Sequence, residues 1–101
     1  MNGSLSEPQK RHLRGRGHAL KPVIRVGPAG LSESLLRETE RALLDHELIK
    51  VRTPALERTA REALLNELAR RTGSRLVQRI GNVGLLYRAH PTKPTLRLPA
   101  A

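Results

Sequence analysis

Apolar residues recur along this chain with two different spacings. A spacing of three and four residues, seen at Leu35, Thr39, Ala42 and Leu43, is typical of an amphipathic helix. Short runs that alternate or are rich in β-branched residues are typical of strands. Taken in order, these patterns predict helices at 6–17, 32–46 and 54–72 and strands at 22–26, 48–52, 75–80 and 83–89. We therefore expect an α+β domain with the element order αβαβαββ.

Polar and small residues mark the ends of these elements. Ser6 begins a capping-box pattern, and Ser32 stands where the N-cap of the second helix is expected. Gly73 ends the third helix, and Gly81-Asn82 is a tight turn that could close a hairpin. For the third helix we expect an inward apolar face made of Leu56, Ala60, Ala63, Leu64 and Leu68.

Length and composition favour one small domain. The chain has 101 residues, of which 38% are hydrophobic, so we expect a single domain over 1–101, ordered at about 5–90 and irregular in the tail 91–101. Cysteine is absent, which excludes disulfides, thiol catalysis and thiolate metal sites. No apolar run approaches the roughly 20 residues of a membrane span. The first residues also lack the apolar stretch of a signal peptide, so we expect a cytoplasmic protein with no membrane partner.

The distribution of charge says more than its total. The net charge is +10, and a small domain with such an excess usually binds a polyanion, most often nucleic acid; a membrane surface is the other candidate. Residues 1–25 hold six basic side chains and one acid, residues 32–72 hold eight of each, and residues 73–101 hold five basic side chains and no acid. If the two ends meet in the fold, they form one positive face.

The acidic, histidine and serine residues give no pattern typical of catalysis. Most acids lie on the two central helices beside a basic residue at helical spacing, where each pair stabilises a solvated helix by about 0.2–0.5 kcal/mol. These pairs are Glu33–Arg37, Glu57–Arg61, Arg58–Glu62 and Glu67–Arg71. No two histidines have the spacing of a helical metal site, and no serine has the glycines of a nucleophile elbow. We expect no catalytic or metal-binding residue, no cofactor, no small-molecule substrate and no enzymatic activity.

A glycine loop joins the first strand to the second helix. The loop Gly27-Pro28-Ala29-Gly30 has the pattern G-x-x-G, in which two glycines let a ligand approach the backbone and the next helix start offers unpaired N–H groups. No Gly-Lys-Ser/Thr follows, so it is not a P-loop. A plain strand-to-helix turn is the other interpretation, and the basic residues Lys21 and Arg25 favour phosphate binding.

Basic residues also alternate with apolar ones in the predicted strands. Lys50 and Arg52 share one face while Ile49 and Val51 share the other. Arg25, Arg79 and Arg88 likewise lie opposite apolar neighbours. Such a row could bind nucleic acid or could be an ordinary solvated sheet face, and both interpretations stay open.

Several segments together resemble a known family. The segments are Leu13-Arg14-Gly15, the run 18–23 with the loop 27–31, the run 46–51, Thr72-Gly73, and Gly81 with 86–88. In order and spacing they are similar to the CRM domain, in particular to the single-domain bacterial YhbY family. The resemblance covers roughly 5–98. It implies an RNA-binding domain with three helices and a mixed four-stranded sheet, similar to the C-terminal domain of a bacterial translation initiation factor. It also implies that the loop contacts RNA and that the protein acts in maturation of the large ribosomal subunit.

The loop departs from the family pattern at its centre. Relatives often carry a lysine or another polar residue there, whereas this chain has Pro28, which lacks an N–H, and Ala29, which has no side-chain donor. Asn82 also stands where relatives often have lysine. We therefore expect the loop to grip phosphate less strongly, and the arginines of the first helix to take a larger share.

These observations lead to one expected function and one alternative. We expect a non-catalytic protein that binds ribosomal RNA or its precursors during assembly of the large subunit, mainly through phosphate contacts, since Tyr87 is the sole aromatic residue. The alternative is a protein-interaction module that docks an acidic partner on the basic face; an RNA-processing enzyme and a DNA-binding protein are further rivals. The candidate RNA-binding residues are Lys10, Arg11, Arg14, Lys21, Arg25, Gly27, Pro28, Ala29, Gly30 and Arg88.

Overall fold

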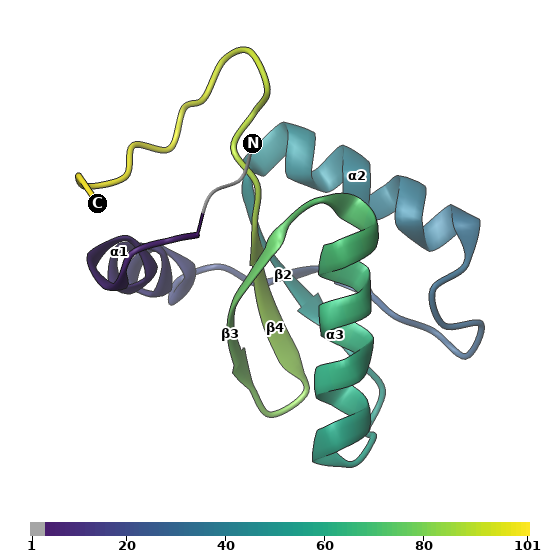
Figure 1. The fold of residues 1–101 in the computed structure, drawn as a ribbon. Helices are drawn as coiled ribbons and strands as arrows, with labels where there is room; N and C mark the ends of the chain where they lie inside the picture. Colours follow the sequence, from purple (N-terminus) through teal and green to yellow (C-terminus); the bar gives the residue numbers. More distant parts are fainter. Residues whose placement is uncertain (1–3) are drawn as a thin grey trace.

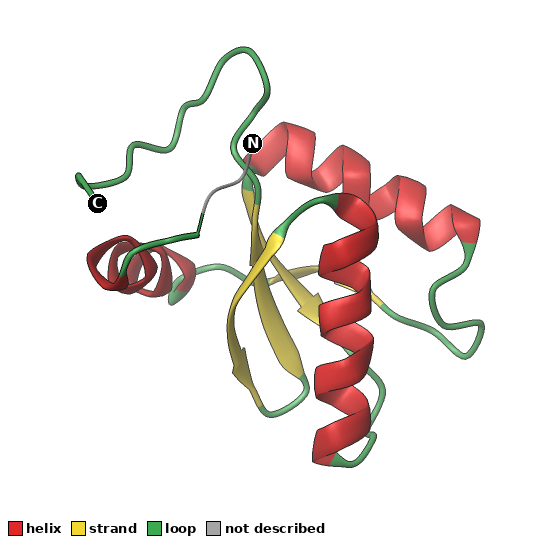
Figure 2. Cartoon of the chain, viewed as in Figure 1, coloured by secondary structure: helices red, strands yellow, loops and turns green. Residues whose placement is uncertain are grey.

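The computed structural model describes residues 4–101 and contains the predicted order of elements (Figures 1 and 2). Its elements are α1 (Glu7–Gly17), β1 (Pro22–Arg25), α2 (Glu33–His46), β2 (Leu48–Arg52), α3 (Arg58–Thr72), β3 (Arg75–Ile80) and β4 (Val83–Tyr87). The strands form one sheet in the order β1-β2-β4-β3. β1 pairs parallel with β2 while the other pairs are antiparallel, so the mixed α+β fold expected from the sequence is confirmed.

The sheet separates two layers of unequal thickness. Figure 1 shows α2 and α3 on one side of the sheet and α1 with the carboxyl-terminal tail on the other. Because side chains alternate along a strand, Ile49 and Val51 of β2 point toward α2 and α3, whereas Leu48 packs in the cluster that contains Leu13 of α1. Lys50 and Arg52 share the face of Leu48, as the alternation predicts.

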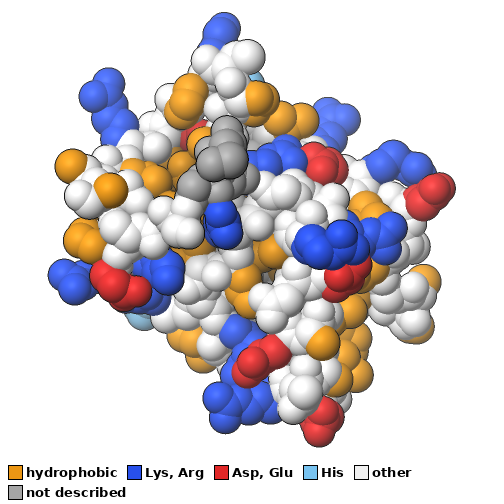
Figure 3. Space-filling model, viewed as in Figure 1, with side chains coloured by type: hydrophobic (Ala, Val, Ile, Leu, Met, Phe, Trp, Pro, Cys, Tyr) orange, Lys and Arg blue, Asp and Glu red, His pale blue; other side chains and the backbone are white. Residues whose placement is uncertain are grey.

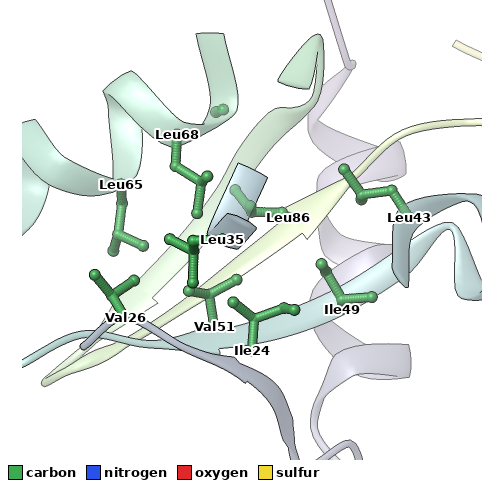
Figure 4. Packing of buried hydrophobic residues seen from close by; sticks show 10 residues of the cluster. Ile24, Val26, Leu35, Leu43, Ile49, Val51, Leu65, Leu68 and Leu86 are labelled. Carbon is green, nitrogen blue, oxygen red and sulfur yellow. The ribbon is translucent and has the colours of Figure 1, made fainter. Parts of the chain in front are cut away.

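The larger core lies between the sheet and the helices α2 and α3 (Figure 4). It consists of Ile24, Val26, Leu35, Leu43, Ile49, Val51, Leu65, Leu68, Ala69 and Leu86. Each fully buried aliphatic side chain stabilises the fold by about 1.5–3 kcal/mol relative to an exposed one. The buried Thr39 fits this core because its hydroxyl donates to the carbonyl oxygen of Leu35 over 2.8 Å.

The inward face of α3 differs from the one expected. Of the expected residues, Leu68 is buried and Leu64 packs against the core, but Ala63 is exposed and Leu56 precedes the helix. Leu65, Ala69 and Thr72 are buried in addition. The cause is a glycine in the facing strand, because a Cβ on Gly84 would lie only 2.8 Å from the methyl carbons of Leu65. The missing side chain of Gly84 makes the space that Leu65 fills, so the buried face of α3 includes Leu65 beside Leu68.

A smaller core lies on the opposite side of the sheet. Leu13 of α1 packs with Leu48, Leu85 and Tyr87, and Leu5, Val77, Ala89, Leu96 and Leu98 surround this group. Residues 91–101 contain no helix or strand, yet Leu96 and Leu98 join this core, and Gln9 donates to the carbonyl oxygen of Pro99 over 3.0 Å. The two ends of the chain therefore meet on the α1 side of the sheet.

The helix ends follow the predicted signals with one exception. Ser6 and Gln9 form the reciprocal capping box, Ser32 caps α2, and Gly73 ends α3 in the left-handed conformation. However, α3 begins at Arg58 with Glu57 as its N-cap, not near Pro54. The reason is that the backbone N–H of Thr53 donates to the carbonyl oxygen of Asn82 over 2.7 Å, which keeps the chain extended beside the β3–β4 turn.

Acidic and basic side chains lie next to one another over α2 and α3 (Figure 3). The predicted pair Arg58–Glu62 is present at 3.3 Å, but Glu67 pairs with Arg70, and Arg61 donates to the side chain of Asn82. Among residues 4–101, no helix is long and apolar enough to cross a membrane, and no group of three potential metal ligands occurs.

Candidate functional site

Helix α1 leaves part of its side of the sheet uncovered, and a groove of about 720 Å³ fills the space. The groove is lined by Arg11, Arg14, Gly15, Gly17, His18, Pro22, Lys50, Arg52, Gln78, Ile80, Val83 and Leu85. α1 can approach β4 this closely because Gly17 has no side chain: a Cβ there would lie 2.7 Å from the methyl carbons of Leu85. The groove therefore exists because a buried leucine on α1 fixes the helix and a glycine sets its distance from the sheet.

The floor of the groove follows the register of three strands. Lys50 of β2 lies opposite Leu85 of β4, which lies opposite Gln78 of β3. One step along the sheet, Arg52 lies opposite Val83, which lies opposite Ile80. Each cross-strand row thus begins with a cation on β2 and continues over an aliphatic side chain on β4. Ile80 is the most exposed part of this floor, at 68%.

Four cations form the rim of the groove. Arg11 and Arg14 are three residues apart on α1 and lie on the same side of the helix, and they face Lys50 and Arg52 of β2 across the groove. None of these four side chains forms a hydrogen bond or ion pair with a residue in 4–101, and no acidic residue of that range lines the groove. The rim is therefore free to bind an anion without displacing an internal partner.

The loop Gly27–Gly30 follows β1 and is exposed at its first three residues. The N–H of Gly30 donates to the carbonyl oxygen of Gly27 over 3.0 Å, which makes a tight turn, and Gly30 has a φ of +67°, a conformation that favours glycine. The N–H of Val26 donates over 2.9 Å to the carbonyl oxygen of Arg52. This backbone bond joins the residue before the loop to a residue of the rim, whereas none of the loop residues lines the groove.

The structure brings most of the candidate residues together. Arg11 and Arg14 line the groove, Lys21 and Arg25 are exposed beside it, and Gly27, Pro28 and Ala29 are exposed in the loop. Arg25 is also the strand partner of Arg52. Lys10 lies on α1 within 3.6 Å of Glu7, in a pair open to solvent. Such exposed pairs contribute about 0–1 kcal/mol, so Lys10 can exchange this partner for another anion.

Arg88 lies apart from this group. Its guanidinium donates to the carboxylate of Glu40 over 2.6 Å and to the carbonyl oxygen of Thr72 over 2.7 Å. The side chain is 17% exposed and joins the end of β4 to α2 and α3. Arg79 is also used internally, since it contacts Glu62 at 3.6 Å and the carbonyl oxygen of Gly81 at 3.0 Å.

The groove adds four polar residues to the candidates chosen from the sequence: His18, Lys50, Arg52 and Gln78. Strand alternation already placed Lys50 and Arg52 on one face, but it could not decide whether that face was covered. His18 and Gln78 also line the groove, and no pattern in the sequence distinguishes them. A strand pattern does not show that α1 covers only part of this face of the sheet.

A buried carboxylate ties the tail to this side of the molecule. The side chain of Glu47 accepts hydrogen bonds from the backbone N–H groups of His90, Thr95 and Leu96 and from the Thr95 hydroxyl, at 2.7–3.0 Å. Burial raises the pKa of Glu47, but these donors outweigh burial and lower the pKa to about 2. Burial, and to a smaller extent the charge of Glu47, raises the pKa of the neighbouring Tyr87.

The fold and the groove together define a small α+β domain with a groove lined by four cations. Residues 5–88 match the CRS1/YhbY (CRM) domain, so the chain belongs to this family and the resemblance seen in the sequence is confirmed.

Three bacterial relatives carry names that refer to RNA. A probable RNA-binding protein of Pseudomonas aeruginosa is 50% identical over 95 residues, which is 94% of this chain and 90% of the relative. An RNA-binding protein of Haemophilus influenzae is 42% identical over 84% of this chain and 86% of the relative. The probable RNA-binding protein YqeI of Bacillus subtilis is 33% identical over 94% and 99%. The solution structure of a hypothetical protein from Staphylococcus aureus matches with a TM-score of 0.81 at 31% identity, over 95% of this chain and all of that one.

Proposed function

We propose that this chain is a non-catalytic RNA-binding protein that acts in the cytoplasm and binds ribosomal RNA or its precursors during assembly of the large ribosomal subunit. Support comes from the names of the bacterial relatives and from the net charge of +10. The absence of catalysis is supported by the use of the acids: Glu47 is saturated by tail donors, and several helical acids pair with arginines.

The observation that carries the proposal is the rim of four cations around the groove. Arg11, Arg14, Lys50 and Arg52 surround the groove, and the backbone of Arg52 is bonded to the residue just before the loop. In this proposal the phosphates follow the cations of α1 and β2, and the RNA backbone extends from Arg52 toward the exposed loop. A sugar-phosphate ligand would displace counterions from these four cations, which form no hydrogen bond or ion pair with their side chains within residues 4–101.

The loop supplies backbone donors rather than charge. The N–H groups of Ala29 and Leu31 donate no hydrogen bond to a residue in 4–101, and they stand just before the first turn of α2. A phosphate at this point would accept from these amides and lie near the positive end of the helix. Because Pro28 has no N–H, the arginines of the rim carry most of the affinity.

The test compares two double variants with the same change in charge. Arg11→Ala with Arg14→Ala removes one wall of the groove, while Arg37→Ala with Arg41→Ala removes two exposed arginines from α2. If each phosphate contact is worth about 1 kcal/mol, the first pair should weaken binding to a large-subunit ribosomal RNA fragment by roughly thirtyfold. The second pair should change it about twofold or less, and equal losses in the two would contradict the proposed site. Gly27→Val, at a position with open space around it, should also weaken binding without lowering the melting temperature.

Sedimentation of a cell lysate tests the ribosomal part of the proposal. The protein should sediment with particles of the large subunit, and treatment with ribonuclease should release it. Sedimentation that survives ribonuclease would favour docking on an acidic protein through the same basic face.

A further inference from the structure

The groove combines a cationic rim with an aliphatic floor, and phosphate binding alone requires only the rim. Cations are sufficient to hold a sugar-phosphate backbone, but this groove also has an aliphatic floor made of Ile80, Val83 and Leu85. Ile80 is the most exposed large hydrophobic residue of the described chain, at 68%. An exposed aliphatic patch enclosed by cations is a site for a ligand that has an apolar part as well as an anionic part.

We propose that the groove holds an unpaired nucleotide, with its phosphate on the rim and its base on the aliphatic floor. This inference rests on the proposed function and specifies which form of RNA the site selects. The groove's volume of about 720 Å³ lies within the range of about 300–1,000 Å³ typical of small-ligand sites. It can accept a single nucleotide but not a duplex, in which the bases are stacked inside the helix and cannot reach the floor.

The register of the sheet gives the orientation of this nucleotide. In each cross-strand row the cation stands on β2 and the apolar side chain on β4. Neighbouring strands lie about 4.8 Å apart, so a row of three residues spans about 10 Å, comparable with one nucleotide from phosphate to base edge. The phosphate would lie near Lys50 and Arg52, and the base would extend over Val83 toward Ile80.

The residues that contact the base follow from this orientation. Tyr87 is buried under α1 and the tail, so it cannot stack on a base. Arg11 and Arg14 of α1 also line the groove, and a guanidinium group there can cover the free face of the base. Gln78 shares the groove and faces Leu85 across the strands; its amide can both donate to and accept from a base edge.

An acidic peptide is the competing occupant for a basic groove, and the floor argues against it. A peptide rich in Asp and Glu would satisfy the rim but would place charged side chains over Ile80 and Val83. Burying a carboxylate against aliphatic carbon without a hydrogen-bond partner is unfavourable, whereas a planar base covers such carbon without leaving a charge unpaired.

The three isoleucines of the chain provide a direct measurement. Ile24 and Ile49 are buried in the core on the other face of the sheet, at 4% and 2% exposure, whereas Ile80 lies in the groove. Protein labelled at the isoleucine methyl groups is titrated with a blunt RNA duplex, with the same duplex carrying a short uridine bulge, and with an oligoglutamate peptide. We expect the Ile80 signal to move with the bulged RNA alone, while the signals of Ile24 and Ile49 stay in place.

Affinities for the same RNAs complete the test. The bulged duplex should bind roughly tenfold more tightly than the blunt one, which corresponds to about 1.4 kcal/mol. Ile80→Ser should remove most of this preference and leave affinity for the blunt duplex unchanged. Leu44→Ser is the matched control, because Leu44 is an exposed leucine on α2, 43% accessible and outside the groove, and it should leave both affinities unchanged.

Each of the remaining outcomes contradicts either the nucleotide site or the proposed function. Equal binding of blunt and bulged RNA by the unmodified protein would overturn the nucleotide site and leave the proposed function intact. An Ile80 signal that moves with oligoglutamate but not with bulged RNA would assign the groove to an acidic protein partner. Failure to bind any RNA would overturn the proposed function, and the inference with it.

Discussion

Glu47 shows how one residue can connect distant parts of a small domain. It follows α2 with a φ of +64°, which is unusual for a residue with a side chain. This backbone conformation turns the carboxylate toward the tail, where it is 2% exposed and accepts four hydrogen bonds. A buried carboxylate is tolerated when its oxygens are satisfied in this way, and the strain at the backbone is offset by the donors that it collects.

The pH dependence of stability should reveal this carboxylate. Its pKa falls from 4.5 to about 2 on folding, so its contribution is complete above pH 4.5 and is lost as the pH falls toward 2. The upper limit of that contribution is about 3 kcal/mol. Unfolding by urea, measured between pH 7 and pH 3, should show wild-type stability declining on the acid side. Glu47→Gln should be less stable at pH 7 and nearly independent of pH in this window, and a variant with an undiminished acid slope would assign the effect to other carboxylates.

Arg88 illustrates what single residues in the sequence cannot reveal. It is a candidate for RNA in the sequence because the predicted strand 83–89 places it opposite an apolar neighbour. Its partners, Glu40 and the carbonyl oxygen of Thr72, lie 48 and 16 residues away along the chain. Only the packing of α2 and α3 against the sheet brings them together, whereas Arg11 and Arg14 can be placed on one side of α1 from the sequence because helical spacing is local.

The contact between α3 and β4 depends on a glycine and a leucine that act as a pair. Local signals located all seven elements, since caps, turns and alternation depend on residues close together in the chain. The inward face of α3 could be predicted only in part: Leu68 is buried as expected, but Leu65 is buried through the space left by Gly84 on another element. The groove depends in the same way on Gly17 and Leu85, which set how closely α1 approaches the sheet.

Alanine substitutions at Gly84 and at Gly15 should have opposite effects on stability. Gly84→Ala places a Cβ 2.8 Å from Leu65 and should lower the free energy of unfolding by about 1–3 kcal/mol. Gly15→Ala, in α1 with nothing within 4 Å, should instead raise it by about 0.5–1 kcal/mol. Denaturation curves of both variants test this. A smaller cost of Gly84→Ala in a Leu65→Ala background would confirm the contact, and an unchanged cost would exclude it.

The fold divides the basic side chains into those that pair with acids and those that line the groove, a division that the sequence does not show. Residues 73–101 carry five basic side chains, but Arg79 and Arg88 are bound to acids of the helices, while Lys93 and Arg97 are exposed on the tail. The groove takes its cations from the first third of the chain and from β2 instead. Meeting of the two ends could be proposed from the charge pattern, but which cations stay free of internal partners depends on tertiary contacts.

The salt dependence of RNA binding follows from the number of cations that can contact phosphate. Five phosphate contacts, made by Arg11, Arg14, Arg25, Lys50 and Arg52, should give a slope of about −3.5 for log K against log salt on single-stranded RNA. Arg52→Gln should reduce the slope by about 0.7. Fluorescence anisotropy at increasing potassium chloride measures both values. A slope near zero would show that phosphate contacts do not dominate.

The anchor at Glu47 also sets the shortest chain that can fold well. The family match ends at residue 88, but three of the four donors to the carboxylate belong to Thr95 and Leu96. A fragment trimmed at the domain boundary would keep Glu47 in the interior and remove most of what binds it, along with the leucines that cover α1. Expression of a minimal version should therefore extend through Leu98, and a fusion partner is best joined before α1.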